Sequence, residues 1–522
     1  MNKDTTSGIN PQFNHDLLSR PKIFTDHIEE QLKLEEPAPH AEILNKLLEQ
    51  FEAVDFKALA FPQVEQIKKE LNDLDPESDQ AKELIKQLGK LKVNTKHYLV
   101  LSIENVRNVA EHNRWGLCKN QEFIYLYNSE YWTHIDEKVF QKFLGEAAFK
   151  MGVPEYTAKF YSFHEQLLKQ FLATEYFPTP EPPKEAVYIN MKNGTFEITT
   201  KGQNKRPFDR LDFLTYQLPF EYNPAAKAPI FQEYLNKVLP DIERQKVLAE
   251  FLGFVFIKNG GNSFKEEKAL ILYGTGANGK SVFFEVVNAL LGIENISTYS
   301  LQSLTDEKGY HRAMIANKLV NYASEINGKL ETSIFKQLVS GEPVEARLPY
   351  GIPMQIKQYS KLIFNCNDLP KDIEHSHAYF RRFLIIPFDV TIPEHEQDKQ
   401  LHTKIIENEL SGVFNWVLEG LNRLLEQKRF SHCEAAKQAI EQYKTESNSV
   451  KQFMEENGYK SSPNNYTLIK DLFIEYRAFC CEDGCTPFKK QNFIKQLRGC
   501  GILIEKINKG NVAYLSKDSD PF

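Results

Sequence analysis

The chain has 522 residues, of which 41% are apolar and 12% aromatic, so it can form several packed cores and does not have the composition of a disordered protein. Its formal net charge of −7 excludes a uniformly basic nucleic-acid coat protein but leaves room for local basic surfaces. The 7 cysteines are widely spread, the N-terminus has no apolar leader, and no apolar run is long enough to span a membrane, so we expect a cytoplasmic protein without membrane contact.

The first 180 residues predict two units. Residues 1–95 begin as a polar segment and then take a helical period, with apolar side chains three and four positions apart. Their function is left open between protein docking, origin recognition and ring assembly. Residues 96–180 mix helical and strand patterns: an alternating aromatic segment at 122–135 predicts a hairpin, and a helix is expected at about 136–151.

A proline-rich segment at 178–185 predicts a stiff, extended linker. The next unit, 185–260, begins with a strand, an Asn-Gly turn and a second strand in 186–200. Helices are expected over 229–258.

The segment YGTGANGKS matches the phosphate-binding pattern G-x-x-x-x-G-K-[ST]. An apolar run precedes it and a helical pattern follows it, which is the strand–loop–helix context that this motif requires. Glycines allow backbone N–H groups to turn toward an anion, and Lys280 is expected to reach the β and γ phosphates. The expected ATP contacts are Gly274, Thr275, Gly276, Ala277, Asn278, Gly279, Lys280, Ser281 and Val282.

Two later apolar segments end in polar residues that could complete a hydrolytic site. Glu325 ends the apolar segment KLVNYASE and is expected to polarise the attacking water. Ser281 and Glu325 are the expected Mg²⁺ site, although Ser324 stands where a second acidic residue is usual. Asn367, at the end of LIFNCN, is the candidate sensor of the γ phosphate, with Asn365 as its competitor.

The order of five segments resembles the superfamily 3 helicase core of phage and plasmid primase–helicases, a group related to the poxvirus-type replicative nucleoside triphosphatase. These segments are GTGANGKS, NYASE, FKQLVSGEPVEARLPY, LIFNCNDLP and YFRRFLIIPF. The resemblance extends over about 185–520. It implies a multidomain α/β protein in which a small domain at 185–260 precedes an AAA+ P-loop motor at 261–395, and a helical segment at 396–446 follows it.

The resemblance also implies a homo-oligomeric ring, commonly a hexamer, with ATP held between subunits. In such a ring Arg382 is the first choice for an arginine finger that reaches the neighbouring nucleotide, and Arg381 is the second. A hairpin projecting into the ring channel is expected after a helix in FKQLVSGEPVEARLPYGIPMQIKQ. Lys336, Arg347 and Lys357 are its candidate contacts to the phosphates of single-stranded DNA.

Residues 447–522 predict a further unit made of two helices and a strand–turn–strand, a pattern that resembles a winged-helix DNA-binding domain. The second helix carries Lys489, Lys490, Lys495 and Arg498, which are expected to contact duplex origin DNA. Three nearby cysteines, Cys480, Cys481 and Cys485, lack the spacing and the fourth ligand of a zinc site.

We therefore predict an ATP-dependent DNA helicase that initiates or drives replication of a phage, plasmid or integrated island, acting in the host cytoplasm. No priming motif is recognised in the first 180 residues, so a separate primase is an expected partner. Two other classes remain open. A P-loop kinase or nucleotide-metabolising enzyme would not respond to DNA, and a DNA-binding scaffold or repressor with weak ATPase activity would bind DNA without nucleotide.

Overall fold

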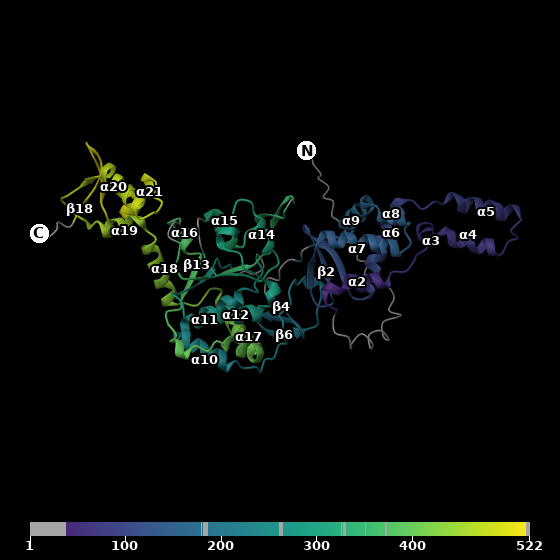
Figure 1. The fold of residues 1–522 in the computed structure, drawn as a ribbon, viewed down its shortest axis with the longest axis horizontal. Helices are drawn as coiled ribbons and strands as arrows, with labels where there is room; N and C mark the ends of the chain where they lie inside the picture. Colours follow the sequence, from purple (N-terminus) through teal and green to yellow (C-terminus); the bar gives the residue numbers. More distant parts are fainter. Residues whose placement is uncertain are drawn as a thin grey trace, which may run out of the picture.

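The computed structural model describes residues 38–178, 180, 186–259, 265–324, 326, 330–349, 351–370 and 373–517. These residues form a multidomain α/β structure that is elongated, with the N-terminal helices at one end and the C-terminal unit at the other (Figure 1). Within those ranges, no helix combines the length and apolar character needed to span a membrane. The expected polar N-terminal segment, most of the expected linker, and Glu325 lie outside the described residues.

The N-terminal unit packs helices on one face of a three-stranded antiparallel sheet. Its helices are α2 (His40–Gln50), α3 (Phe56–Ala60), α4 (Gln63–Asn72), α5 (Asp79–Lys90), α6 (Thr95–His112), α7 (Glu137–Lys150), α8 (Glu155–Lys159) and α9 (Tyr161–Thr174). Its strands, in sheet order, are β1 (Gly116–Asn120), β2 (Phe123–Tyr127) and β3 (Trp132–Ile135). The predicted hairpin and the predicted helix at 136–151 are confirmed.

Both faces of β2 are buried, but in different cores. Ile124 and Leu126 join the core beneath α6, α7 and α9, whereas Tyr125 and Tyr127 join a second core with Phe213 of the next unit. Because neighbouring side chains of a strand point to opposite faces, this one strand connects the two units.

The next unit consists of a meander and two helices. Its elements are β4 (Ala186–Met191), β5 (Gly194–Thr199), β6 (Gly202–Arg206), the short 3-10 helix η3 (Arg210–Asp212), α10 (Pro229–Val238) and α11 (Ile242–Phe254). The helical region expected at 229–258 is divided because Pro240 cannot donate to a helical bond and disfavours helical geometry at Leu239. Asp241 then caps α11 by accepting from the backbone N–H of Glu243 at 2.9 Å.

The central unit is a five-stranded parallel sheet with the strand order β13-β7-β12-β9-β8. The strands are β7 (Ala269–Tyr273), β8 (Ile296–Ser297), β9 (Val320–Ala323), β12 (Lys361–Cys366) and β13 (Phe383–Pro387). The helices between them are α12 (Lys280–Leu291), η4 (Ile293–Asn295), α13 (Leu301–Leu304), α14 (Tyr310–Met314), α15 (Thr332–Ser340) and α16 (His377–Phe380). Leu270 and Leu272 enter one core and Ala269 and Ile271 the other, as expected for a parallel strand covered on both faces.

A two-stranded hairpin, β10 (Val344–Arg347) with β11 (Pro353–Ile356), interrupts the central unit. Beyond β13 come η5 (Glu394–Glu396), the long helix α17 (Leu401–Gln427) and α18 (Glu434–Glu446). Helices α11 and α17 approach closely at two glycines. A Cβ on Gly253 would lie 2.7 Å from the Leu421 Cβ, and one on Gly420 would lie 2.3 Å from the carbonyl carbon of Ala249.

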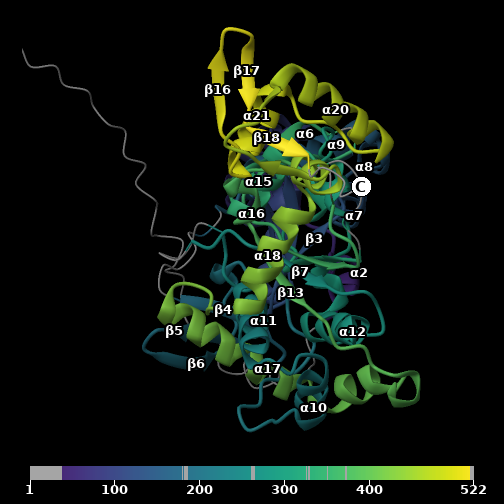
Figure 2. The ribbon, with the colours of Figure 1, turned by 90° about the vertical axis from the view of Figure 1, so that its left-hand side faces the viewer.

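The C-terminal unit has its own apolar core. Its elements are α19 (Ser449–Glu456), β14 (Tyr459–Ser461), β15 (Thr467–Leu468), α20 (Ile469–Glu482), α21 (Lys490–Gly499), β16 (Ile504–Ile507), β17 (Gly510–Ala513) and β18 (Leu515–Lys517). The expected two helices and the following strand–turn–strand are present, and β17 lies between β15 and β16 in a three-stranded sheet. Figure 2 shows the β16–β17 hairpin projecting beyond the helices of this unit.

Candidate functional site

The glycine-rich loop joins the carboxyl end of β7 to the start of α12. Backbone φ is positive at Gly276 (115°), Ala277 (48°) and Gly279 (87°). Left-handed residues in such a loop form the concave backbone that binds anions, and the following helix N-terminus adds a partial positive charge. Thr275 and Ala277 are exposed, so the outer side of the loop is open to a ligand.

Neighbouring segments fix the loop at both ends. The Asn278 side-chain amide donates to the Phe388 carbonyl at 3.1 Å, and the Tyr234 hydroxyl donates to the Gly279 carbonyl at 2.8 Å. A Cβ on Gly274 would lie 2.3 Å from the Asn278 amide nitrogen, and one on Gly279 would lie 2.7 Å from Val238 Cγ1. The loop is therefore shaped in advance by the segment after β13 and by α10.

Lys280 is 6% exposed, and its ammonium group folds back onto the loop. Its Nζ donates to the Gly274 carbonyl at 2.5 Å and to Asn278 Oδ1 at 3.2 Å. Burial lowers the pKa of this lysine, and no ion pair joins it to a carboxylate among the described residues. Its acceptors are neutral, so the oxygens of a phosphate would replace them favourably. Ser281 is exposed beside it, and Val282 packs against the core.

The candidate polar residues gather at the same carboxyl edge of the sheet. Strand β12 lies between β7 and β9, with Cys366 opposite Tyr273, so Asn367 follows its strand next to the start of the loop. Asn367 is exposed, whereas Asn365 accepts a hydrogen bond from the Tyr322 hydroxyl at 3.0 Å. That bond gives Asn365 a structural partner and favours Asn367 as the sensor. Strand β9 ends at this edge, with Ser324 exposed just beyond it.

The two arginines lie at the opposite edge of the sheet. Phe383 pairs with Ala269 at the amino end of β7, and the Ala269 N–H donates to the Arg382 carbonyl at 2.8 Å. A strand of five residues spans about 16 Å, so the length of β7 separates these arginines from the loop of their own chain. The structure therefore does not bring them to the phosphate loop of the same subunit.

Arg381 and Arg382 have different surroundings. Arg382 is 8% exposed and contacts the Ala378 carbonyl, Ser340 Oγ at 3.0 Å and Glu267 at 3.3 Å. The side chain of Arg381 is 47% exposed and pairs with Glu267 at 2.6 Å. Burial alone would raise the pKa of Glu267, but the two guanidinium groups outweigh it and lower that pKa. The buried contacts of Arg382 hold it within its own subunit, so we reverse the expected order and place Arg381 first.

The expected hairpin is confirmed, but its three candidate DNA contacts differ in availability. Arg347 is exposed at the end of β10, where its Nε donates to the Gly351 carbonyl at 2.8 Å, and Lys357 is exposed just after β11. Lys336 lies on α15 and contacts both carboxylate oxygens of Glu374 at 2.8 Å. This pairing makes Lys336 less available to DNA than Arg347 and Lys357.

The four basic residues predicted on the C-terminal unit lie on and beside α21. Phe493 and Leu497 face the core, while Lys489, Lys490, Lys495 and Arg498 are exposed. No salt bridge involves these four residues within the described part of the chain. They form a solvent-facing basic surface.

A cavity of about 160 Å³ that the sequence did not predict adjoins the phosphate loop. Tyr273, Pro387 and Asp389 line it from the central unit, and Gln438 and Gln442 line it from α18. It exists because α18 returns to pack along β13. Packing of this kind between distant segments has no periodic signature in a sequence.

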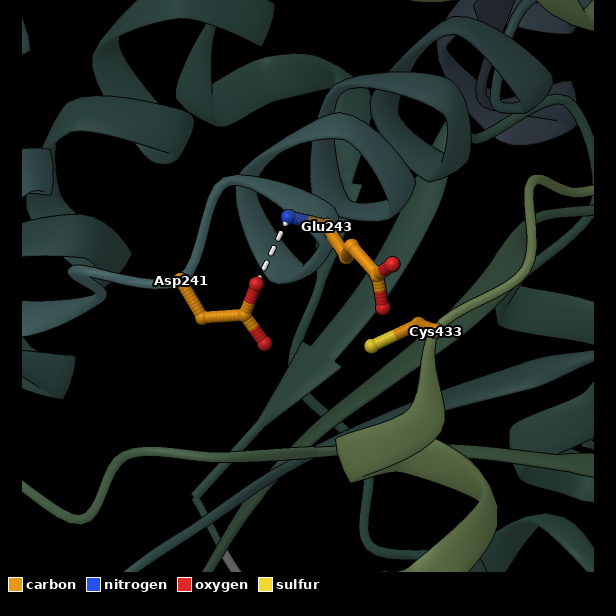
Figure 3. Close-up of side chains that lie close together, drawn as sticks. All are labelled: Asp241, Glu243 and Cys433. Carbon is orange, nitrogen blue, oxygen red and sulfur yellow. Dashed lines mark hydrogen bonds between the residues drawn. The ribbon is translucent and has the colours of Figure 1, made fainter.

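The carboxylates of Asp241 and Glu243 lie beside the Cys433 thiol, with their potential ligand atoms within 4.8 Å of one another (Figure 3). Both carboxylates already cap helices. Asp241 accepts from the Glu243 N–H, and Glu243 accepts from the Glu434 N–H at the start of α18, at 3.1 Å. Helix capping explains this cluster without a metal ion.

Two family models match parts of the chain. The model "D5 N terminal like" matches residues 109–240, and the model "Family of unknown function (DUF5906)" matches residues 272–382, which include the phosphate loop and both arginines. A protein of Acanthamoeba polyphaga mimivirus named "Putative helicase L207/L206" is 30% identical over 168 residues. That alignment covers 30% of this chain and 16% of the viral protein, so the chain matches only a small part of its relative.

Solved structures of the apo NrS-1 C-terminal region are also similar. One is 11% identical and has a TM-score of 0.41, and a second is 14% identical and has a TM-score of 0.42. Each comparison covers 79% of this chain and 98% of the NrS-1 chain.

Proposed function

We propose that this chain is an ATP-dependent DNA helicase of a replicating mobile element, which forms a ring and hydrolyses ATP between adjacent subunits. The observation that supports the proposal is that a phosphate-binding type of loop and an exposed arginine lie at opposite edges of one sheet. The phosphate loop and Asn367 lie at the carboxyl edge, and Arg381 lies at the amino edge. A second copy of the chain that presents its amino edge would complete the site.

The residues of the loop suit ATP and Mg²⁺. Lys280 is held by neutral acceptors that phosphate oxygens can replace, and the exposed Ser281 hydroxyl follows it at the start of α12. Ser281 and Glu325 would hold Mg²⁺, which neutralises charge on the β and γ phosphates. Glu325 would polarise the attacking water and Asn367 would sense the γ phosphate. The cavity between Tyr273 and Gln442 offers space for the adenine base.

The half-exposed guanidinium of Arg381 would stabilise the charge that develops on the transferred phosphoryl group of the adjacent subunit. Its present partner Glu267 is a single carboxylate near the surface, and an exposed ion pair of that kind is worth about 1 kcal/mol or less. Arg381 can therefore leave Glu267 for a phosphate at small cost.

DNA is the proposed track of the motor. Exposed Arg347 lies at the turn end of β10 and exposed Lys357 directly follows β11. The basic α21 lies in a unit with the helix and strand order of a winged helix. The name of the mimivirus relative, which includes the word helicase, agrees with this assignment. Single-stranded DNA would contact the hairpin, and duplex DNA would contact α21.

ATP turnover with and without single-stranded oligonucleotide tests the proposal. We expect the unmodified chain to be stimulated by DNA and Lys280→Ala to lose turnover. Lys169→Ala, which changes an exposed lysine on α9 of the N-terminal unit, is the matched control and should behave as wild type. Turnover that ignores DNA would instead indicate a nucleotide-metabolising enzyme. Absence of turnover with nucleotide-independent DNA binding would indicate a scaffold or repressor.

A further inference from the structure

A second cavity, of about 90 Å³, lies where the N-terminal unit, the meander unit and the central unit meet. The N-terminal sheet contributes Asn120 and Tyr125, and the chain just beyond α11 contributes Lys258. The central unit contributes Lys318, just before β9, and Lys361, the first residue of β12. Both residues stand at the amino ends of parallel strands, so this cavity is on the side of the sheet opposite the phosphate loop.

Three lysines line this cavity, and the ammonium group of each donates to a neutral acceptor. Lys258 Nζ donates to the Asp212 carbonyl at 3.5 Å, Lys318 Nζ to the Glu294 carbonyl, and Lys361 Nζ to Asn259 Oδ1 at 2.5 Å. None of the three forms a salt bridge in the described part of the chain. The neighbouring carboxylate of Asp212 is engaged by Arg206 at 2.8 Å. Asp212 and Glu294 therefore lie near Lys258 and Lys318 without pairing with them, and Lys361 has no carboxylate partner in the described part of the chain.

Burial makes the charged form of these lysines less favourable. Burial lowers the pKa of Lys361 to about 7 and that of Lys258 to about 8, and it also lowers the pKa of Lys318. Asp212 raises the pKa of Lys258 and Glu294 raises that of Lys318, but neither carboxylate offsets burial. A structural role would account for Lys361, which also lies 4.3 Å above the ring of Phe254. It does not account for three lysines around one cavity.

We propose that this cavity binds a phosphate group of single-stranded DNA, held by Lys258, Lys318 and Lys361. The assignment to DNA rests on the proposed helicase function. Gln358 and Tyr359 in the cavity wall directly follow Lys357, so the cavity adjoins the base of the β10–β11 hairpin, within reach of a DNA strand bound by Lys357. A volume of about 90 Å³ is enough for several water molecules or for one phosphate group that replaces them.

The test is calorimetric titration of the full chain carrying Lys280→Ala, which removes anion binding at the phosphate loop. Unlabelled oligothymidylate is the probe, since its phosphodiesters do not titrate between pH 6 and pH 9. We expect Lys258→Met and Lys361→Met each to weaken binding about tenfold, the value of one charge-assisted hydrogen bond. Lys399→Met should have no effect. Thermal unfolding of each variant verifies the fold.

The pH dependence of oligonucleotide affinity is a second test, and it needs no substitution in the cavity. Binding requires charged lysines, so affinity should fall at least tenfold as the pH rises from 6 to 9 through the lowered pKa values of Lys361 and Lys258. The tyrosines in the wall, Tyr125, Tyr216 and Tyr359, have raised pKa values and stay neutral over this range. Ordinary surface lysines, with a pKa near 10.4, would give nearly constant affinity.

Stabilisation of the chain against thermal unfolding by inorganic sulfate tests whether the cavity binds a free anion instead of a DNA phosphate. Sulfate stabilisation that depends on these lysines, combined with unaltered oligonucleotide binding, would overturn the assignment to DNA. Unchanged affinity in both Met variants and a flat pH profile would overturn the site itself. If those variants also keep DNA-stimulated ATP turnover, the helicase proposal stands while the cavity proposal fails.

Discussion

At the scale of single residues, the adjacent arginines divide two tasks that the sequence could not separate. Both precede an apolar strand in YFRRFLIIPF, and nothing in that pattern says which guanidinium faces outward. The structure buries Arg382 among the Ala378 carbonyl, Ser340 and Glu267 and leaves Arg381 half exposed. Burial is a property of packing between segments that are far apart in the chain, so it is not encoded in local spacing.

The arginine pair yields the first prediction. Arg381→Ala should lower ATP turnover by about 10³-fold or more, the value of an arginine finger, while thermal unfolding stays close to that of the unmodified chain. Arg382→Ala should destabilise the fold by about 1–2 kcal/mol, because it removes a buried side chain and its hydrogen bonds to Ser340 and the Ala378 carbonyl, while Glu267 keeps Arg381. Turnover and unfolding are measured on both variants. Equal effects of the two substitutions on both properties would contradict the division of roles.

The second prediction concerns the shape of the phosphate loop. Gly274→Ala would place a Cβ 2.3 Å from the Asn278 amide nitrogen and 2.5 Å from the Phe388 carbonyl oxygen, so the loop must shift. We expect nucleotide affinity, measured by equilibrium binding, to fall at least tenfold. Gly89→Ala is the matched control because a Cβ there meets nothing within 4 Å in α5, and it should stabilise the chain by about 0.5–1 kcal/mol. Wild-type affinity in Gly274→Ala would show that the loop adapts freely.

At the scale of secondary-structure elements, local patterns predicted what local interactions determine. The strand before the phosphate loop, the helix after it and the hairpin at 123–135 appear where their periodicity places them. The break between α10 and α11 was not predicted, although Pro240 is visible in the sequence, because the apolar period continues across it. The packing of α18 along β13, which forms the cavity beside Tyr273, had no local signal at all.

The hairpin β10–β11 carries the third prediction. Arg347→Ala combined with Lys357→Ala should weaken binding of single-stranded DNA and make the logarithmic salt dependence shallower by about 0.7 for each DNA phosphate that is no longer neutralised. Lys336→Ala should have a smaller effect on both quantities, because Glu374 already pairs with that lysine. Binding is measured over a series of salt concentrations. A larger effect of Lys336→Ala than of the double variant would restore Lys336 as a DNA-binding residue.

At the scale of the whole molecule, the parallel strands of the central sheet place the phosphate loop and the two arginines at opposite edges. The basic C-terminal unit follows α18, and the N-terminal unit lies at the other end of the elongated chain (Figure 1). The phosphate loop lies at one edge of the sheet and Arg381 at the other, so under the proposed function each subunit alone is an incomplete catalyst. Composition and charge do not show which residues share an edge of the sheet. That information comes from the parallel pairing of β7, β12, β9 and β13.

The fourth prediction follows from this incompleteness and uses a mixture of two inactive chains. Lys280→Ala retains Arg381, and Arg381→Ala retains the phosphate loop. In a ring with head-to-tail contacts, a site works only when an intact loop faces an intact arginine. Random mixing in equal amounts places each intact partner with a probability of one half, so about a quarter of the sites should function. Turnover of the mixture is compared with that of each variant alone and of the unmodified chain.

A matched mixture shows whether the recovery comes from shared sites. Lys280→Ala mixed with the double variant Lys280→Ala, Arg381→Ala contains no intact loop, so it should show no turnover at any ratio. Recovery in the first mixture alone means that loop and arginine come from different copies, as their separation by the length of β7 requires. Absence of recovery under conditions where subunits exchange would mean that the arginine serves its own chain. The pairing of β7 with β13 would then have to break, because it holds Arg381 and the phosphate loop at opposite ends of β7.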